Sequence, residues 1–323
     1  MFFKKSSKRV FRLFFATDIH GSDVCWRKFL NAAHHYQADV LVLGGDLTGK
    51  AIVPIVQEEK TRWSVRFLDA DYELHSESEV RDLERVIADR GYYPVVLTRE
   101  ALESMLNDST SQSALFQRLM LERVDRWMQL ADERLASAGL TCYVCPGNDD
   151  PFEIDERIAR AKTVQLAEGR VIELFGYQMA STGWSNRTPW HTYREEDEDA
   201  LYGRIQLMVQ QLRVPPERVI LNLHCPPFAS GLDDAPEIGE DLRVRYAGRA
   251  TRPVGSRAVR RVIEELQPIV SLHGHIHEGR GTTRIGRTLC INPGSSYEQG
   301  QLLGAVIDFD GSSRLSRYLL TVG

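Results

Sequence analysis

Three histidines stand close together at positions 273–277, where Gly274 and Ile276 separate His273, His275 and His277. Histidine is the commonest protein ligand for metal ions, and two imidazoles one residue apart at a strand end can point into one pocket. Surface histidines also gather by chance, so this cluster alone leaves metal binding open. It predicts a metal site if matching ligands follow other strands of the chain.

Such candidates do follow the other apolar runs that are typical of buried strands. The runs at 11–17, 40–43, 140–145 and 218–223 lead to residues that offer oxygen or nitrogen donors. Ligand-binding residues collect at the carboxyl ends of strands in α/β sheets, so we expect these side chains to meet. Each aspartate alone is compatible with a turn or a helix cap. The full set of candidate metal ligands is Asp18, His20, Asp46, Asn148, His224, His275 and His277.

The number and type of these donors indicate a reaction class. Seven nitrogen and oxygen donors are more than one first-row metal ion usually takes from a protein. They suit two ions that share a carboxylate, and ions roughly 3.5–4 Å apart hold a bridging hydroxide and polarise a phosphoryl oxygen. The set therefore predicts an enzyme, a dinuclear-metal-dependent phosphoesterase that hydrolyses a small phosphomonoester or phosphodiester by a metal-bridging hydroxide.

The segments between these strand ends alternate between strand and helix patterns, which indicates an α/β fold. Helices are expected at about 24–36 and 256–266, and a hairpin at 171–180. No repeat or interdomain linker interrupts the chain, so we expect a single domain over 1–323.

From 51 to 139 the pattern changes, and no further candidate ligand follows a strand. Ser76 and Glu79 have the spacing of a capping box at a helix start. A longer helix carries an apolar stripe at helical spacing that includes Trp127. We therefore expect a mainly helical insertion over 51–139, placed like a cap beside the active site, whose stripe packs against the body of the protein.

The composition is that of an ordinary globular protein, with 42% hydrophobic and 26% charged residues. The formal net charge of −5 argues against a protein that holds long nucleic acid by bulk electrostatics. No stretch has the length and apolar character of a membrane span, so no membrane partner is expected. The sequence carries no signal for an oligomeric state.

Cysteine usage bears on the cellular compartment. The five cysteines are an odd number scattered along the chain, which suits a reducing cytoplasm better than a disulfide framework. Cys142 and Cys145 have redox-motif spacing, but we favour two strand residues on opposite faces over a thiol-redox or zinc role. The start at 1–9 is basic, yet the short apolar run after it leads directly to Asp18 and His20. A cleaved signal peptide would remove these ligands, so we expect a cytoplasmic protein.

The ordered set Asp18-x-His20, Gly45-Asp46, Gly147-Asn148, His224 and Gly274-His275-x-His277 resembles the calcineurin-like metallophosphoesterases. The resemblance covers about 13–294, interrupted by the insertion. It implies a four-layer αββα sandwich of two mixed β-sheets flanked by helices, with the metals at the strand ends. It also implies a first metal held by Asp18, His20 and His277, a second held by Asn148, His224 and His275, and Asp46 as the bridge. The resemblance implies manganese or iron as the usual metal, and zinc also fits.

One position departs from the family pattern. The family commonly places a histidine after the asparagine, where it contacts the phosphate and assists the leaving group, whereas this chain has Asp149. A carboxylate near two cations is held in its charged form and is a poor proton donor. Three interpretations follow: Asp149 or Asp150 still acts as an acid or orients water, the leaving group needs no acid, or catalysis is lost. The candidate catalytic residues are thus Asn148 and Asp149, with His273 and His191 as replacements for the histidine.

Two classes of function remain open on the sequence. The first is the metal-dependent hydrolase of a small phosphate ester. The second is a catalytically weakened, metal-binding scaffold or interaction protein of the same fold, which the residue at position 149 suggests. A nuclease that takes short or single-stranded substrates is a third alternative.

Overall fold

The computed structural model describes residues 10–239, 245, 250–311 and 315–323. The basic residues at 1–9, which entered the signal-peptide prediction, lie outside this part of the chain. Within the described ranges, no helix combines the length and the apolar character that crossing a bilayer requires.

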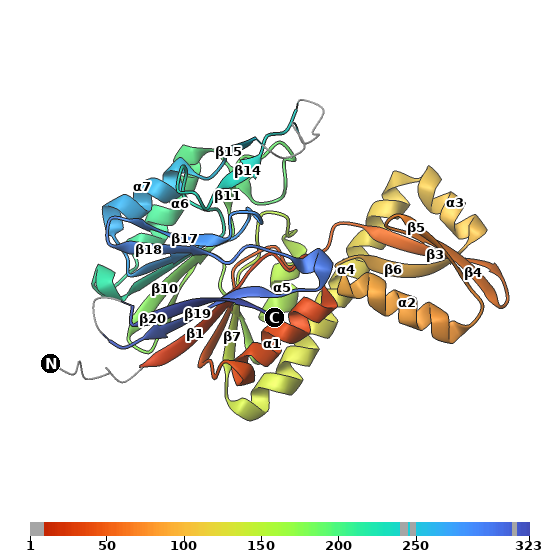
Figure 1. The fold of residues 1–323 in the computed structure, drawn as a ribbon, viewed down its shortest axis with the longest axis horizontal. Helices are drawn as coiled ribbons and strands as arrows, with labels where there is room; N and C mark the ends of the chain where they lie inside the picture. Colours follow the sequence, from red (N-terminus) through yellow and green to blue (C-terminus); the bar gives the residue numbers. More distant parts are fainter. Residues whose placement is uncertain (1–9, 240–244, 246–249, 312–314) are drawn as a thin grey trace.

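Two six-stranded mixed sheets form the body of the molecule (Figure 1). In the first, β1, β2, β7 and β8 run parallel and the antiparallel pair β19–β20 extends the edge beside β1. Its strands are β1 (Phe11–Ala16), β2 (Val40–Leu43), β7 (Thr141–Val144), β8 (Val164–Leu166), β19 (Leu303–Phe309) and β20 (Arg317–Val322).

The second sheet has a similar plan, with four parallel central strands and an antiparallel strand at each edge. In spatial order its strands are β17 (Gly281–Ile285), β18 (Thr288–Asn292), β16 (Val270–Leu272), β13 (Val219–Leu223), β10 (Tyr177–Thr182) and β9 (Arg170–Leu174). The expected hairpin at 171–180 is confirmed as β9 and β10. Two-stranded ribbons, outside both sheets, are formed by β11 (Ser185–Asn186) with β12 (Glu195–Glu196) and β14 (Asp234–Pro236) with β15 (Thr251–Pro253).

Alternating side chains along β1 show how the layers are built. Phe11, Leu13 and Phe15 face the second sheet and join the core between the sheets, whereas Phe14 and Ala16 join the core under the helices. Helices α1 (Asp23–His35), α4 (Ser109–Leu135) and α5 (Glu153–Ala159) cover the first sheet, and α6 (Glu198–Val209) and α7 (Arg257–Leu266) cover the second. This arrangement is the expected four-layer αββα sandwich.

The insertion differs from its prediction in one respect. It is helical over most of its length, as expected, and Ser76 caps α2 by accepting a hydrogen bond from the backbone N of Glu79. However, it also contains a four-stranded sheet in the order β5-β4-β3-β6, with its own small core, which the sequence analysis did not predict. Besides α4, its elements are β3 (Ile52–Glu59), β4 (Arg62–Phe67), β5 (Ala70–Leu74), α2 (Glu77–Asp89), β6 (Tyr93–Thr98) and α3 (Arg99–Asn107).

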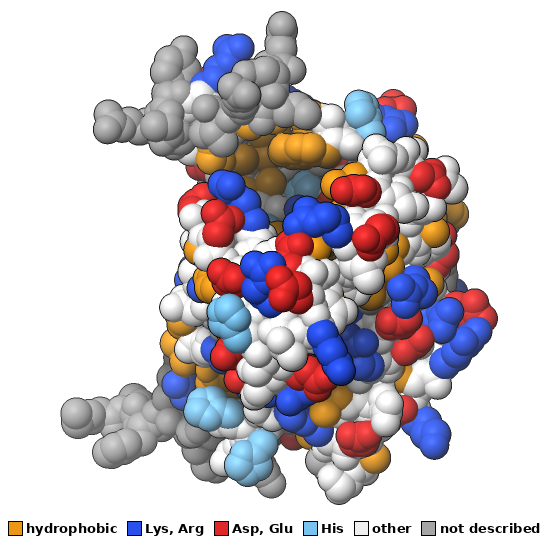
Figure 2. Space-filling view, turned by 90° about the vertical axis from the view of Figure 1, so that its right-hand side faces the viewer, with side chains coloured by type: hydrophobic (Ala, Val, Ile, Leu, Met, Phe, Trp, Pro, Cys, Tyr) orange, Lys and Arg blue, Asp and Glu red, His pale blue; other side chains and the backbone are white. Residues whose placement is uncertain are grey.

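The base of the insertion packs against the loops that carry the first candidate ligands, while its sheet stands to one side of the sandwich (Figure 1). The buried guanidinium of Arg123 in α4 donates to the carbonyl oxygens of Gly21 and Tyr92. The hydroxyl of Tyr93 accepts a hydrogen bond from the backbone N of Gly49. The segment that leads into β6 is therefore bonded to the turns that follow β1 and β2. Figure 2, which faces this side, shows positive and negative side chains interspersed over the surface.

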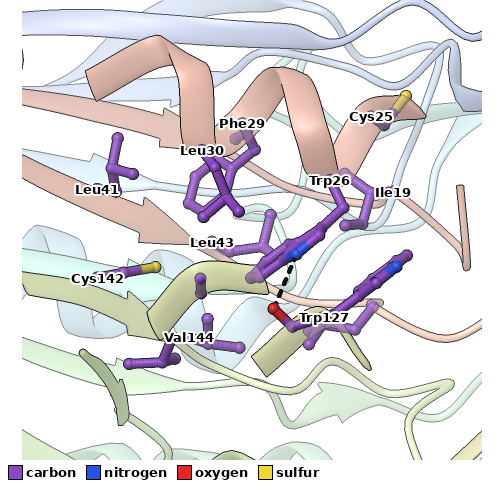
Figure 3. Packing of buried hydrophobic residues seen from close by; sticks show 14 of the residues in the cluster. Ile19, Cys25, Trp26, Phe29, Leu30, Leu41, Leu43, Trp127, Cys142 and Val144 are labelled. Carbon is purple, nitrogen blue, oxygen red and sulfur yellow. Dashed lines mark hydrogen bonds between the residues drawn. The ribbon is translucent and has the colours of Figure 1, made fainter. Parts of the chain in front are cut away.

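The apolar stripe of α4 packs into the main core, as predicted. Trp127 stacks on Trp26 of α1 with ring centroids 5.1 Å apart, and the indole N of Trp26 donates to the backbone oxygen of Trp127 (Figure 3). Both indoles are almost fully buried. Helix α4 therefore belongs to the helical layer of the sandwich.

We expect Trp127→Ala to lower the free energy of unfolding by about 3–5 kcal/mol, because it leaves a large cavity between α1 and α4. Urea unfolding followed by circular dichroism measures the change. Arg126→Ala, at an exposed position of the same helix, is the control and should stay within about 0.5 kcal/mol of the parent. Equal losses in the two variants would show that α4 is not part of the main core.

Candidate metal centre

The seven candidate ligands lie together where the parallel strands of both sheets end. Potential ligand atoms of Asp18, His20 and His277 lie within 4.8 Å of one another, and so do those of Asp46, His224 and His275. Asn148 completes the set, since its Oδ1 atom lies 3.1 Å from Nε2 of His224. The structure thus brings together every residue that the sequence analysis proposed as a ligand.

Contacts within and between the two groups are also short. The Nε2 atoms of His20 and His277 are 3.0 Å apart. Oδ2 of Asp46 lies 3.3 Å from Nε2 of His224 and 3.7 Å from Nε2 of His20, so this carboxylate stands between the groups. Its position suits the bridging role that the family resemblance implies.

The backbone is strained at four of these residues. Asp18, His20, Asp46 and His275 have positive φ angles of 52°, 38°, 50° and 66°. Such angles are uncommon for residues other than glycine and persist where surrounding contacts hold them. The backbone N of His20 donates to the oxygen of Asp46, and the backbone N of His275 donates to the carboxylate of Asp18. Ligand loops from remote segments therefore hold one another in place.

Close approach explains two of the glycines beside the ligands. A Cβ atom on Gly147 would lie 2.2 Å from Oδ1 of Asp46, and one on Gly274 would lie 2.3 Å from Oδ2 of Asp18. Either contact would push a carboxylate out of the cluster. The glycines that precede Asn148 and His275 therefore make room for ligands that come from other strands.

The electrostatics of the cluster suit metal binding. Burial disfavours ionisation of Asp18 and Asp46, but the neighbouring histidines, His224 foremost, outweigh it and hold the pKa of both carboxyl groups below the usual range. Burial likewise acts against a charged His224, yet the two carboxylates raise the pKa of this imidazole to about 9. Burial lowers the pKa of His20 to about 3 and that of His275 to about 4. Near neutral pH the carboxylates are thus ionised and these two imidazoles neutral, the states that bind metal, while metal binding would displace a proton from His224.

Supporting residues orient the ligands without lining the site. Nδ1 of His224 lies 3.1 Å from the backbone oxygen of Gly44, which directs Nε2 toward the cluster. Asp150 is fully buried and accepts hydrogen bonds from the backbone N atoms of Leu47, Thr48 and Gly147. It ties the loops after β2 and β7 together, and this role differs from the catalytic one considered above.

Neither histidine considered as a replacement occupies the place of the missing one. His273 is fully buried, and its Nδ1 lies 2.8 Å from the oxygen of Leu223 and 3.0 Å from that of Cys225. It therefore ties β16 to the end of β13. His191 is exposed and does not line the cavity at the cluster.

Asp149 has a partner that the sequence analysis missed. Its carboxylate lies 2.7 Å from Nζ of Lys50, and its backbone N donates to Oδ1 of Asp46. Burial and Asp46 raise the pKa of Asp149, and the ammonium opposes this shift. A single lysine near the start of an insertion is ordinarily solvated, so nothing in the sequence distinguished Lys50 from other surface cations.

A cavity of about 840 Å³ opens over the cluster. Besides five of the candidate ligands (His20, Asp46, Asn148, His275 and His277), its walls include Lys50, Asp149, Arg187, Trp190 and Arg257. Figure 2 shows a hollow on this side of the molecule with hydrophobic side chains in its walls. Most ligand pockets have volumes of about 300–1,000 Å³, so a small organic phosphate fits this space.

We expect Gly147→Ala to weaken Mn²⁺ binding by about tenfold or more, because the new methyl group displaces Asp46. Isothermal titration calorimetry on protein stripped of metal measures the affinity. Gly203→Ala is the matched control, since a Cβ there meets nothing within 4 Å and should leave the affinity unchanged. Unchanged affinity in both variants would show that Asp46 does not bind the ion.

Comparisons with known proteins agree with this architecture. No family model matches the chain. The uncharacterized protein MJ1162 of Methanocaldococcus jannaschii is 26% identical over 172 residues, which cover 51% of this chain and 71% of that protein. The solved structure of TT1561 of Thermus thermophilus is 14% identical with a TM-score of 0.52, and covers 97% of this chain and 98% of its own. Another solved chain is 16% identical with a TM-score of 0.54, and covers 96% and 98%.

At these identities the solved structures show a shared fold. Two mixed sheets between helical layers, with the aspartates, asparagine and histidines gathered at the strand ends, are the features that the sequence resemblance implied. The chain therefore shares its fold with these solved structures, and this fold is the four-layer αββα sandwich that the sequence resemblance implied.

Proposed function

We propose that this protein is a metal-dependent phosphoesterase that hydrolyses a small phosphomonoester or phosphodiester. The observation that carries the proposal is the convergence of two donor groups, with Asp46 between them, on the floor of one open cavity. The buried, free cysteines accord with the cytoplasmic location that we also propose.

The donor chemistry fits a pair of divalent ions. Imidazole suits zinc and iron, and carboxylate and amide oxygens suit manganese. Asp18, His20 and His277 would hold one ion, Asn148, His224 and His275 the other, and Asp46 would contact both. Bound there, the ions would lower the pKa of a water molecule and polarise the phosphoryl oxygen.

Asn148 is held by its own hydrogen bonds in the orientation that this role needs. Its Nδ2 atom donates to Oδ1 of Asp149 and to the hydroxyl of Thr192. With both amide hydrogens committed, Oδ1 is the atom that faces His224. This assignment of amide oxygen and nitrogen follows from the hydrogen-bond network.

Lys50 gives Asp149 a different role from that of the family's histidine. The Lys50 ammonium, 2.7 Å from the Asp149 carboxylate, favours the charged form of that carboxylate and so makes it a poorer source of protons. The ammonium itself lines the cavity, where it can approach the oxygens of a phosphate group. We therefore propose that Asp149 is a positioning residue and that Lys50 stabilises the negative charge that develops on the phosphoryl group.

The competing function is a metal-binding scaffold with little turnover. The same ion pair favours it, because Lys50 and Asp149 stand where the family has its leaving-group histidine. An ester whose leaving group needs no protonation would still be hydrolysed at such a site. Whether the protein acts as a phosphoesterase or only as a scaffold therefore depends on the ester it meets.

We expect purified protein to hydrolyse aryl phosphates or phosphodiesters in the presence of Mn²⁺, and EDTA to abolish the activity. Release of p-nitrophenol, followed by absorbance, measures it. Asp149→His separates the alternatives: a large gain shows a weakened site, whereas a loss shows a site adapted to the ion pair. Absence of hydrolysis in both proteins, despite bound Mn²⁺, would favour the scaffold.

We also expect Lys50→Met to lower kcat/KM by about 10- to 1,000-fold, because one preorganised charge beside the reacting group is removed. Lys60→Met, at an exposed position in the insertion, is the control and should keep the parent value. Steady-state kinetics on the same aryl ester measure both. Equal kcat/KM in the two variants would contradict a role for Lys50 in the reaction.

A further inference from the structure

The cavity over the cluster contains an exposed indole that the proposed reaction does not use. Trp190 is 58% exposed, whereas Trp26, Trp63 and Trp127 are buried and Trp184 is half-buried beneath the guanidinium of Arg204. Tryptophan gains a large buried area when a partner covers its ring, so an indole in the wall of a cavity is suited to contact a ligand there. Trp190 lines the same cavity as His20 and His277.

The loop that carries Trp190 is fixed by a single carboxylate. Glu195 accepts hydrogen bonds from the backbone N and the hydroxyl of both Thr188 and Thr192, the residues on either side of Trp190. The backbone N of Trp190 donates in turn to the hydroxyl of Thr188. The indole is thus mounted on a clamped turn.

The clamp also connects the loop to the candidate metal centre. The hydroxyl of Thr192 accepts a hydrogen bond of 2.9 Å from Nδ2 of Asn148 and donates one of 2.6 Å to Glu195. Two consecutive hydrogen bonds therefore link the proposed ligand Asn148, through Thr192, to the carboxylate that clamps the turn of Trp190. A surface loop that served only as a connection would not need this link.

We propose that Trp190 is a stacking platform for a planar ring in the organic part of the substrate, so that aryl or nucleobase-containing phosphate esters are preferred over aliphatic ones. The inference rests on the proposed phosphoesterase function. Base-to-aromatic stacking is insensitive to the identity of the ring, because every aromatic ring has a π face. The phosphate would lie over the cluster while the ring packs against the indole.

The rest of the cavity wall suits a substrate that has a phosphate group at one end and a planar ring at the other. Phe228 adds a second apolar ring, over which the guanidinium of Arg257 lies 3.9 Å from the centroid. Arg187 and Lys50 supply positive charge to the same space. A volume of about 840 Å³ is far larger than a phosphate group needs, so the chain offers room for a ring as well as an anion.

The test is equilibrium binding of two phosphonates that the enzyme cannot hydrolyse, phenylphosphonate and methylphosphonate, to Mn²⁺-loaded protein by isothermal titration calorimetry. We expect phenylphosphonate to bind about 5- to 100-fold more tightly, as one stacked ring contributes. Trp190→Ala should remove most of this preference, and Trp190→Phe should retain it. Tyr318→Ala, an exposed aromatic position outside the cavity, is the control and should leave the ratio unchanged.

Adenosine 5′-monophosphate and ribose 5-phosphate form a second pair that separates a nucleobase from a simple aryl ring. A preference confined to one pair identifies the kind of ring, and a preference in both shows a general platform. Equal affinities within both pairs, or a ratio that Trp190→Ala leaves intact, would overturn the proposal. Hydrolysis of aryl and alkyl esters with equal kcat/KM would contradict the stacking platform but leave the phosphoesterase function standing. Ring-selective binding without hydrolysis would support the platform and contradict the phosphoesterase function.

Discussion

Two buried carboxylates, Asp18 and Asp46, impose the constraint on which the rest of the site depends. Both are almost fully buried at adjacent strand ends, and like charges removed from water repel each other strongly. A positive charge has to lie between or beside them, and the imidazoles of His224, 3.3 Å from Asp46, and His277, 3.5 Å from Asp18, can supply it when protonated. A pair of divalent ions would satisfy the same requirement with more charge. Buried ionised carboxylates surrounded by imidazoles therefore suit bound cations better than they suit an ordinary structural core.

The fold meets this constraint by bringing together strand ends that are remote in sequence. Asp18 and Asp46 follow neighbouring parallel strands of one sheet, and His224 and His275 follow neighbouring strands of the other. The sheets pack face to face, so the two sets of loops meet at one edge of the sandwich. This close approach requires positive φ angles at several ligands and glycines, without Cβ atoms, beside them. Hydrogen bonds between the loops, such as those of Asp150, hold the arrangement.

The sequence was informative wherever a residue with a metal-binding side chain followed a long apolar run. Each strand of this kind was identifiable, and the donors after it could be collected into a set from their places along the chain alone. The sheet of the insertion was missed although β4 alternates polar and apolar residues, because β3 contains Pro54 and β5 is almost wholly exposed, so neither neighbour of β4 resembles a buried strand in sequence. Lys50 and the clamp at Glu195 were missed for a different reason. Their roles come from contacts between side chains in three dimensions, and the spacing of residues along the chain does not show these contacts.

The direct test of the account is the position of metal ions in crystals of the protein grown with Mn²⁺, located by anomalous diffraction. We expect two peaks, one within bonding distance of Asp18, His20 and His277 and the other of Asn148, His224 and His275, with Asp46 contacting both. Density at these residues without an anomalous signal, or ions bound only elsewhere on the chain, would contradict it.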